Sequence, residues 1–115
     1  MNLWQKQALF AEHVGMLIDY IYTSKYYCTF GDAYRTAQQA ESYAAQGIGI
    51  KDSLHCKRLA IDLNLISPDG KYLTDSKDYE RFGCFWESLD SANRWGGRFK
   101  SRPDGNHFER QENSF

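Results

Sequence analysis

The chain has 115 residues, a formal net charge of −1, and a composition that is 42% hydrophobic and 16% aromatic. This length suits one domain, and the apolar content excludes a disordered chain. The near-neutral charge gives no long-range attraction to nucleic acid or to an anionic membrane. Its three cysteines, Cys28, Cys56 and Cys84, form no CxxC pair, which favours free thiols over a disulfide framework.

The first predicted element is an amphipathic helix over Leu3–Thr23, within an N-terminal segment of residues 1–25. Apolar side chains recur there at spacings of three, four and seven, the period of a helix with one buried stripe. The stripe consists of Leu3, Phe10, Val14, Leu17, Ile18 and Ile21. Charged residues interrupt this apolar segment, so we expect no export signal and a protein made in the cytoplasm.

Two further elements are predicted before the middle of the chain. Tyr26–Phe30 is aromatic and β-branched and reads as a short strand. Thr36 is placed to cap a helix over Ala37–Ala45, and Gly47 is a natural residue to follow its end. Gly47 and Gly49 together predict a flexible connection after this helix.

A half-buried strand is predicted at Leu59–Ile66, before the turn Ser67–Gly70. Its residues alternate between apolar and small or polar side chains. One face therefore carries Leu59, Ile61, Leu63 and Leu65, and the other carries Ala60, Asp62 and Asn64. We expect the leucine face to pack on the core and the other face to be available for chemistry.

The third predicted helix begins at Thr74 or Asp75 and ends at Leu89. Its apolar side consists of Tyr79, Phe82, Phe85, Trp86 and Leu89. This aromatic side is expected to complete the core.

Two short strands, Trp95–Phe99 and His107–Glu109, follow and are joined by the turn Arg102–Asn106. Residues 110–115 are polar except for the last and are expected to form a tail. The whole pattern predicts one α+β domain over residues 1–115, with a small antiparallel sheet packed against helices.

Four residues of the second half carry the chemistry of a hydrolytic metal site. His55, Asp62 and His107 can supply three ligands to zinc, which in catalytic sites leaves a fourth position for water. Asp104 lies three residues before His107, across a glycine-containing turn, and is placed to accept and return a proton. Taken singly, each of these residues is more often structural, so spacing alone leaves this a minority hypothesis.

Longer motifs strengthen the hypothesis. Ser53–Asp62 closely resembles the SxHxxGxAxD motif of the zinc D-alanyl-D-alanine and L-alanyl-D-glutamate peptidases, peptidase family M15 with the VanY-type fold. Asp104–Glu109 resembles the second motif of that family, an acidic residue followed three positions later by the last ligand. Tyr34–Thr36 with Gln39, and Trp95–Gly97, resemble two further segments, so the resemblance covers most of the chain.

The resemblance implies a zinc D-Ala-D-Ala peptidase-like fold of the Hedgehog/DD-peptidase type and a role for each matching residue. It implies Zn²⁺ ligation by His55, Asp62 and His107, and substrate contacts by Ser53, Gln39 and Trp95. Asp104 would act as general base and then as general acid. Arg35 would polarise the scissile carbonyl or stabilise its oxyanion, which suits a fixed guanidinium. Glu109 is one candidate to accept a hydrogen bond from a ligand histidine, and the sequence leaves this role undecided.

The chain departs from the family pattern at three positions. Arg58 replaces a glycine, Arg98 replaces a frequent acidic residue, and Asp104 stands where many relatives have glutamate. None of these changes removes a metal ligand. His13, in the first helix, has no metal-binding partner four residues on and is interpreted as structural.

The resulting hypothesis is a monomeric zinc peptidase that cleaves the stem peptide of bacterial peptidoglycan. The motifs resemble those of small phage-type members of the family, several of which are cell-wall lysins, so we expect a phage endolysin active in host lysis on the cell wall, without membrane insertion. The bond, L-alanyl-D-glutamate or D-alanyl-D-alanine, and hence endopeptidase or carboxypeptidase action, stays open. One alternative is a catalytically silent peptidoglycan-binding module of the same fold. Another is a nucleic-acid-binding protein that uses the basic stretch Arg94–Arg102.

Overall fold

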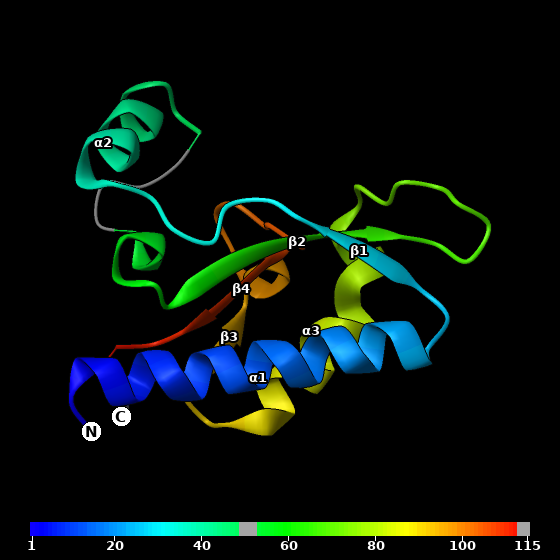
Figure 1. The fold of residues 1–115 in the computed structure, drawn as a ribbon. Coiled ribbons are helices and arrows are strands. Elements are labelled where there is room, and N and C mark those ends of the chain that lie inside the picture. The colour runs from blue at the N-terminus through cyan, green and yellow to red at the C-terminus, as the bar shows by residue number, and fades with distance from the viewer. Residues whose placement is uncertain (49–52, 113–115) are drawn as a thin grey trace.

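The computed structural model describes residues 1–48 and 53–112, so Gly49 lies outside the described residues. In this part of the chain, a four-stranded antiparallel sheet has the order β1-β2-β4-β3. The strands are β1 (Tyr27–Phe30), β2 (Ala60–Ile66), β3 (Asn93–Trp95) and β4 (His107–Arg110). Helices pack on this sheet, which confirms the predicted α+β class (Figure 1).

Helix α1 (Leu3–Thr23) has the predicted bounds. The Asn2 side chain accepts a hydrogen bond from the Gln5 backbone, and the Gln5 side chain accepts one from the Asn2 backbone, so the first turn is closed by a capping box. Phe10, Leu17 and Ile21 are buried on its inner side. The helix runs along the same side of the sheet as α3, and the two helices pack against each other (Figure 1).

Helix α2 (Ala37–Ala45) also has the predicted bounds. Thr36 and Gln39 form its capping box, and Gly47 adopts a left-handed φ of 74° just beyond its last residue. Only Ala40 is buried in this helix. The helix therefore stands apart from the core (Figure 1).

Helix α3 (Glu80–Leu89) is shorter than predicted, because a 3₁₀ turn, η2 (Ser76–Tyr79), precedes it. The Tyr79 hydroxyl accepts a hydrogen bond from the Leu65 backbone at 2.9 Å and donates one to the Leu73 carbonyl at 2.8 Å. These two bonds fix Tyr79 in the core and set where the chain turns into the helix. The expected start at Thr74 or Asp75 was wrong for this reason.

The core lies between the leucine face of β2 and the two helices α1 and α3. Leu63 and Leu65 are fully buried, and Trp86 of α3 packs edge-on against Phe10 and Phe108. Burying each such side chain stabilises the fold by about 1.5–3 kcal/mol. The predicted alternation of β2 is confirmed, because Asp62 and Asn64 lie on its less buried face.

The predicted strand Trp95–Phe99 was wrong beyond its first residue, because β3 ends at Trp95 and a 3₁₀ turn, η3 (Gly96–Arg98), follows. The Trp95 indole lies so close to Gly97 that a Cβ there would stand 2.1 Å from the ring. Gly83 of α3 approaches the same ring equally closely. The chain thus wraps around the indole instead of extending.

The predicted tail begins later than Arg110. Arg110 is the last residue of β4, pairs with Asn93 of β3, and is only 4% exposed. Its guanidinium lies 3.1 Å from the Asp90 carboxylate.

The three cysteines are free thiols, as predicted. Across residues 1–48 and 53–112, no helix has the length and hydropathy required to cross a bilayer.

Candidate metal centre

The sheet and one 3₁₀ turn bring His55, Asp62 and His107 together. Asp62 on β2 is the direct register partner of His107 on β4. His55 comes from the 3₁₀ turn η1 (Leu54–Lys57), immediately before β2. The candidate ligand atoms of the three side chains all lie within 4.8 Å of one another.

One carboxylate oxygen of Asp62 stands at the centre of this cluster. Its Oδ1 lies 3.3 Å from Nδ1 of His107 and 3.4 Å from Nε2 of His55. These contacts are longer than an ordinary N–H···O hydrogen bond of about 2.9 Å. They match the separation of about 3.4 Å between two ligands of a tetrahedral zinc ion with bonds of about 2.0–2.1 Å.

The His55 imidazole gives a second indication of a cation site. The residue is 1% exposed, and neither ring nitrogen forms a hydrogen bond within the described part of the chain. An unsatisfied buried polar group costs roughly 1–3 kcal/mol. A cation that takes Nε2 as a ligand removes that cost at Nε2, so the donor set fits a divalent metal such as zinc.

The charges of the cluster are strongly coupled. Burial alone would raise the pKa of Asp62, but the imidazoles of His107 and His55 lower it to about 2. Burial alone would lower the pKa of His107, but its hydrogen bonds to Asp62 and Glu109 raise it to about 9. The Asp62 carboxylate is thus ionised near neutral pH, as a metal ligand must be.

Glu109 orients His107 from the side away from Asp62. Nε2 of His107 lies 2.7 Å from Oε1 of Glu109, and Arg94 donates to the other Glu109 oxygen from Nε at 2.9 Å. Glu109 is opposite Ala60 in the register, and the small alanine leaves room for it. Because Nε2 is held by Glu109, Nδ1 of His107 is the atom presented to the cluster. The Arg94 contact was not predicted, although Arg94 is the register partner of Glu109.

Arg35 lies at the opposite edge of the cluster. Its Nε donates to Asp32 at 2.8 Å, and one terminal nitrogen lies 3.6 Å from Oδ2 of Asp62. Its backbone N–H also bonds the His55 carbonyl at 3.3 Å. Asp32 was missed in the sequence, where its only signal is the i, i+3 spacing to Arg35. The guanidinium is thus fixed next to the metal-ligand candidates.

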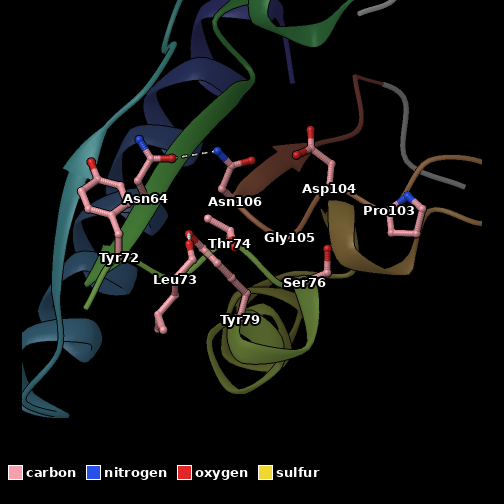
Figure 2. Close-up of a pocket in the computed structure, with 10 residues that line it drawn as sticks. All are labelled: Asn64, Tyr72, Leu73, Thr74, Ser76, Tyr79, Pro103, Asp104, Gly105 and Asn106. Atoms are coloured by element: carbon pink, nitrogen blue, oxygen red, sulfur yellow. Dashed lines mark hydrogen bonds between the residues drawn. The ribbon is translucent and has the colours of Figure 1, made fainter. Parts of the chain in front are cut away.

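Asp104 lies in the turn that leads into β4, and Figure 2 shows its carboxyl group at the edge of a pocket. Partial desolvation and the negative charge of Asp62 raise its pKa. The turn is held by Gly96, whose carbonyl accepts from the Asp104 backbone at 2.9 Å. A Cβ on Gly96 would meet the Asp104 carbonyl oxygen at 2.3 Å, so this position requires glycine.

The three predicted substrate contacts have structural partners of their own. Ser53 is buried, and its hydroxyl accepts from the His55 backbone at 3.1 Å, which caps the turn η1. The Gln39 side chain closes the α2 cap at Thr36. The Trp95 indole is 4% exposed and donates to the Gly105 carbonyl at 2.8 Å, so it supports the Asp104 turn from behind.

The backbone explains why the family motif has glycine at position 58. Arg58 ends the turn η1 in the left-handed conformation, with φ 55° and ψ 38°. Glycine adopts this conformation without the steric cost that other residues meet. Here the arginine side chain compensates in part, because its guanidinium stacks on the Tyr34 ring at 4.1 Å.

The basic stretch near the C-terminus is partly neutralised within the chain. Arg94 pairs with Glu109, and Arg98 pairs with Glu87 at 2.7 Å.

His13 lies on the core side of the molecule. Its Nδ1 is hydrogen-bonded to the side-chain nitrogen of Asn93 at 3.3 Å. It is buried, which agrees with its structural interpretation.

The described residues thus form a small α+β fold whose antiparallel sheet carries a histidine–aspartate cluster. Residues 46–110, more than half of the chain, match the model of a peptidase family, M15, described as D-alanyl-D-alanine carboxypeptidase. The chain therefore belongs to this family, as the motifs predicted. A search of curated proteins gave no match.

Solved structures confirm the fold. The Serratia marcescens L-Ala D-Glu endopeptidase ChiX matches with a TM-score of 0.63 and 19% identity, over 74% of this chain and 67% of ChiX. A Zn(II) complex of a mutant of the vancomycin resistance D,D-pentapeptidase VanY, from a VanB-type cassette, matches with a TM-score of 0.55 and 17% identity. That match covers 88% of this chain and 70% of VanY.

Proposed function

We propose that this protein is a zinc-dependent peptidase that hydrolyses an amide bond in the stem peptide of bacterial peptidoglycan. The observation that carries the proposal is the pair of distances around Oδ1 of Asp62, 3.3 and 3.4 Å, which match two edges of a tetrahedral zinc site. Family membership supports it, as do the two similar structures, which are named for peptidase activities.

The proposed ligands are Nε2 of His55, Oδ1 of Asp62 and Nδ1 of His107. Bound zinc would supply Lewis acidity, which polarises the scissile carbonyl and lowers the pKa of water. Glu109 would hold the His107 ring in the orientation that presents Nδ1. Arg35 would stabilise the negative charge that develops on the carbonyl oxygen, because Asp32 fixes its guanidinium beside the cluster.

Asp104 would carry the proton. As a base, its carboxylate takes the proton of the attacking water, and as an acid it then gives that proton to the leaving amine. The raised pKa of Asp104 suits this double use, since it makes the carboxylate a better base for water and keeps the protonated form populated until the leaving amine takes the proton. Ser53 would act indirectly by fixing His55, while substrate contacts by Gln39 and Trp95 would require these side chains to leave their present partners.

The biological setting proposed is that of a phage-type endolysin acting on the host wall, which rests on the motif resemblance alone. A catalytically silent wall-binding module of the same fold is the second candidate. It is the weaker one, because all three candidate ligands and the Asp104 carboxyl group are present.

The test is zinc content together with hydrolysis. The purified protein is expected to hold about one zinc per chain and to release new amino groups from purified peptidoglycan. Asp104→Asn, which keeps the side-chain shape, should retain zinc and lose hydrolysis, whereas His107→Ala should lose zinc. Zinc binding without amine release would favour the silent module, and equal zinc loss in both variants would make Asp104 a ligand.

A further inference from the structure

A pocket opens beside Asp104 and is not part of the ligand cluster. Its volume is about 270 Å³, close to the lower end for small-molecule sites, so it suits a short peptide segment. Figure 2 shows the Asn64 and Asn106 side chains next to each other and joined by a hydrogen bond, with Asp104 beyond Asn106. The other lining residues are Tyr72, Leu73, Thr74, Ser76, Tyr79, Pro103 and Gly105.

The two asparagine side chains bond each other, and each keeps one group with which it can bind a ligand. Asn64 keeps a donor and Asn106 keeps an acceptor. The Asn106 side-chain nitrogen donates to Oδ1 of Asn64 at 2.9 Å, which fixes both amides. Within the described chain, no hydrogen bond occupies the side-chain N–H groups of Asn64 or the side-chain oxygen Oδ1 of Asn106, while the Asn106 backbone carbonyl accepts from Leu63. The free donor of Asn64 and the free acceptor of Asn106 lie at the two ends of this hydrogen-bonded pair (Figure 2). Together they are complementary to a peptide or carboxamide group, which offers one C=O and at least one N–H.

The charges that line the pocket favour a neutral ligand over an anionic one. Among the described residues that line the pocket there is no lysine, arginine or histidine, and the one carboxyl group is that of Asp104. A free carboxylate in this pocket would find no cation in the lining and would face Asp104, whereas an amide would meet neither cost. Arg35, the nearest guanidinium to the cluster, is held by Asp32 and is not part of the lining.

The pocket continues the surface of the metal centre. Asn64 is two residues after Asp62 on the same face of β2, which places it roughly 7 Å farther along the strand. Asn106 likewise lies between Asp104 and His107 in the turn. An extended peptide advances about 3.3 Å per residue, so a substrate held at the cluster reaches Asn64 about two residues from the cleaved bond.

We propose that this pocket binds an uncharged, amide-bearing segment of the substrate, about two residues from the cleaved bond, through the Asn64 donor and the Asn106 acceptor. The inference rests on the proposed peptidase function and names a specificity of the same site. The pocket discriminates against a free carboxylate at that position.

The first test uses the zinc-loaded protein and two blocked peptides that differ at one group, a carboxamide or a free carboxylate two residues from the cleaved bond. We expect kcat/KM for the carboxamide to be at least tenfold higher, which corresponds to about 1.4 kcal/mol. Side-chain amide signals of Asn64 and Asn106 in ¹⁵N NMR spectra report binding without turnover. They should shift with a neutral N-acetyl dipeptide amide and much less with its free acid.

A charge-swap variant tests the same claim from the protein side. Thr74 lines the pocket and is exposed, so Thr74→Lys adds a cation without disturbing the core. It should reduce or reverse the preference for the carboxamide. Ser88→Lys adds the same charge on the exposed side of α3, outside the pocket, and should leave the preference unchanged.

The outcomes separate this inference from the proposed function. Cleavage of both peptides with equal kcat/KM, or tighter binding of the acid, would overturn the pocket assignment and leave the peptidase standing. Amide-selective shifts at both asparagines without any cleavage would support the pocket and reject the peptidase. Unmoved signals together with no cleavage of peptides or peptidoglycan would reject both.

Discussion

Replacing Gly96 by alanine should impair the proposed chemistry indirectly. The added methyl group would displace the turn that carries Asp104 and His107 and would change neither side chain. Gly96→Ala places a Cβ 2.3 Å from the Asp104 carbonyl oxygen and 2.9 Å from Cβ of His107. Gly96 is not among the residues with positive φ, so alanine is permitted by the backbone itself. The effect must therefore come from contact with the turn that carries both residues.

The magnitude follows from these distances. A carbon–oxygen contact normally lies near 3.3 Å or more, so the turn must move by about 1 Å. A displacement of about 1 Å in a catalytic group costs on the order of 10²-fold in rate. Overpacking of this kind also destabilises a fold by about 1–3 kcal/mol. We therefore expect kcat/KM to fall about 100-fold and zinc affinity to fall with it, while the protein still folds.

The assay combines amine release from peptidoglycan, zinc competition with a chromophoric chelator, and urea unfolding. Gly15→Ala is the matched control, because a Cβ there meets nothing within 4 Å on the exposed side of α1. It should stabilise the protein by roughly 1 kcal/mol and leave both other readouts unchanged. Wild-type kcat/KM and zinc affinity in a folded Gly96→Ala protein would refute the reasoning.

Three further predictions test separate parts of the structure. Glu109→Gln, which removes the charge facing His107, should weaken zinc binding about 10- to 100-fold, and unchanged zinc affinity in chelator competition would show that the Glu109 contact does not support the ligand. Arg58→Gly should be more stable than Arg58→Ala by about 1 kcal/mol in urea unfolding, because both lose the stacking on Tyr34 and only alanine meets the left-handed strain; equal stabilities would argue against that conformation. Asp90→Ala should cost about 2 kcal/mol at neutral pH, because the Ala92 backbone N–H loses its hydrogen-bond acceptor and the buried Arg110 guanidinium loses its ion-pair partner. These contacts lower the Asp90 pKa below its usual 3.8, so the cost should shrink as the pH falls below that value, and a cost independent of pH would contradict it.

Local patterns in the sequence predicted most of the fold. The bounds of α1 followed from the spacing of its apolar residues, and those of α2 from the Thr36 cap and Gly47. The structure adds a capping box at the start of each helix. The two faces of β2 followed from strict alternation of apolar and polar side chains. Where one local rule dominates, the sequence alone is sufficient.

The errors fall where tertiary contacts override local preference. The chain around Trp95 reads as a strand, but its ring must fit between two glycines, so the backbone turns. Arg110 reads as the start of a polar tail, yet strand pairing and Asp90 bury it. No local pattern reports either contact, because each partner is distant in the sequence or fixed only by packing.

The sequence predicted the candidate metal ligands, but it did not predict Arg94 and Asp32, which hold Glu109 and Arg35 in place. The convergence of His55, Asp62 and His107 came from motifs, and the structure brings them together. The roles of Arg94 and Asp32 depend on strand register and on the path of a loop, which a single sequence does not specify. The same is true of the pair Asn64 and Asn106, whose contact joins a strand to a distant turn.

The most direct test of the central claim is anomalous diffraction at the zinc edge from crystals of the zinc-loaded protein. One peak is expected, with bonds of about 2.0–2.2 Å to Nε2 of His55, a carboxylate oxygen of Asp62 and Nδ1 of His107. A zinc ion bound elsewhere, or one that lacks any of these three side chains, would contradict the account.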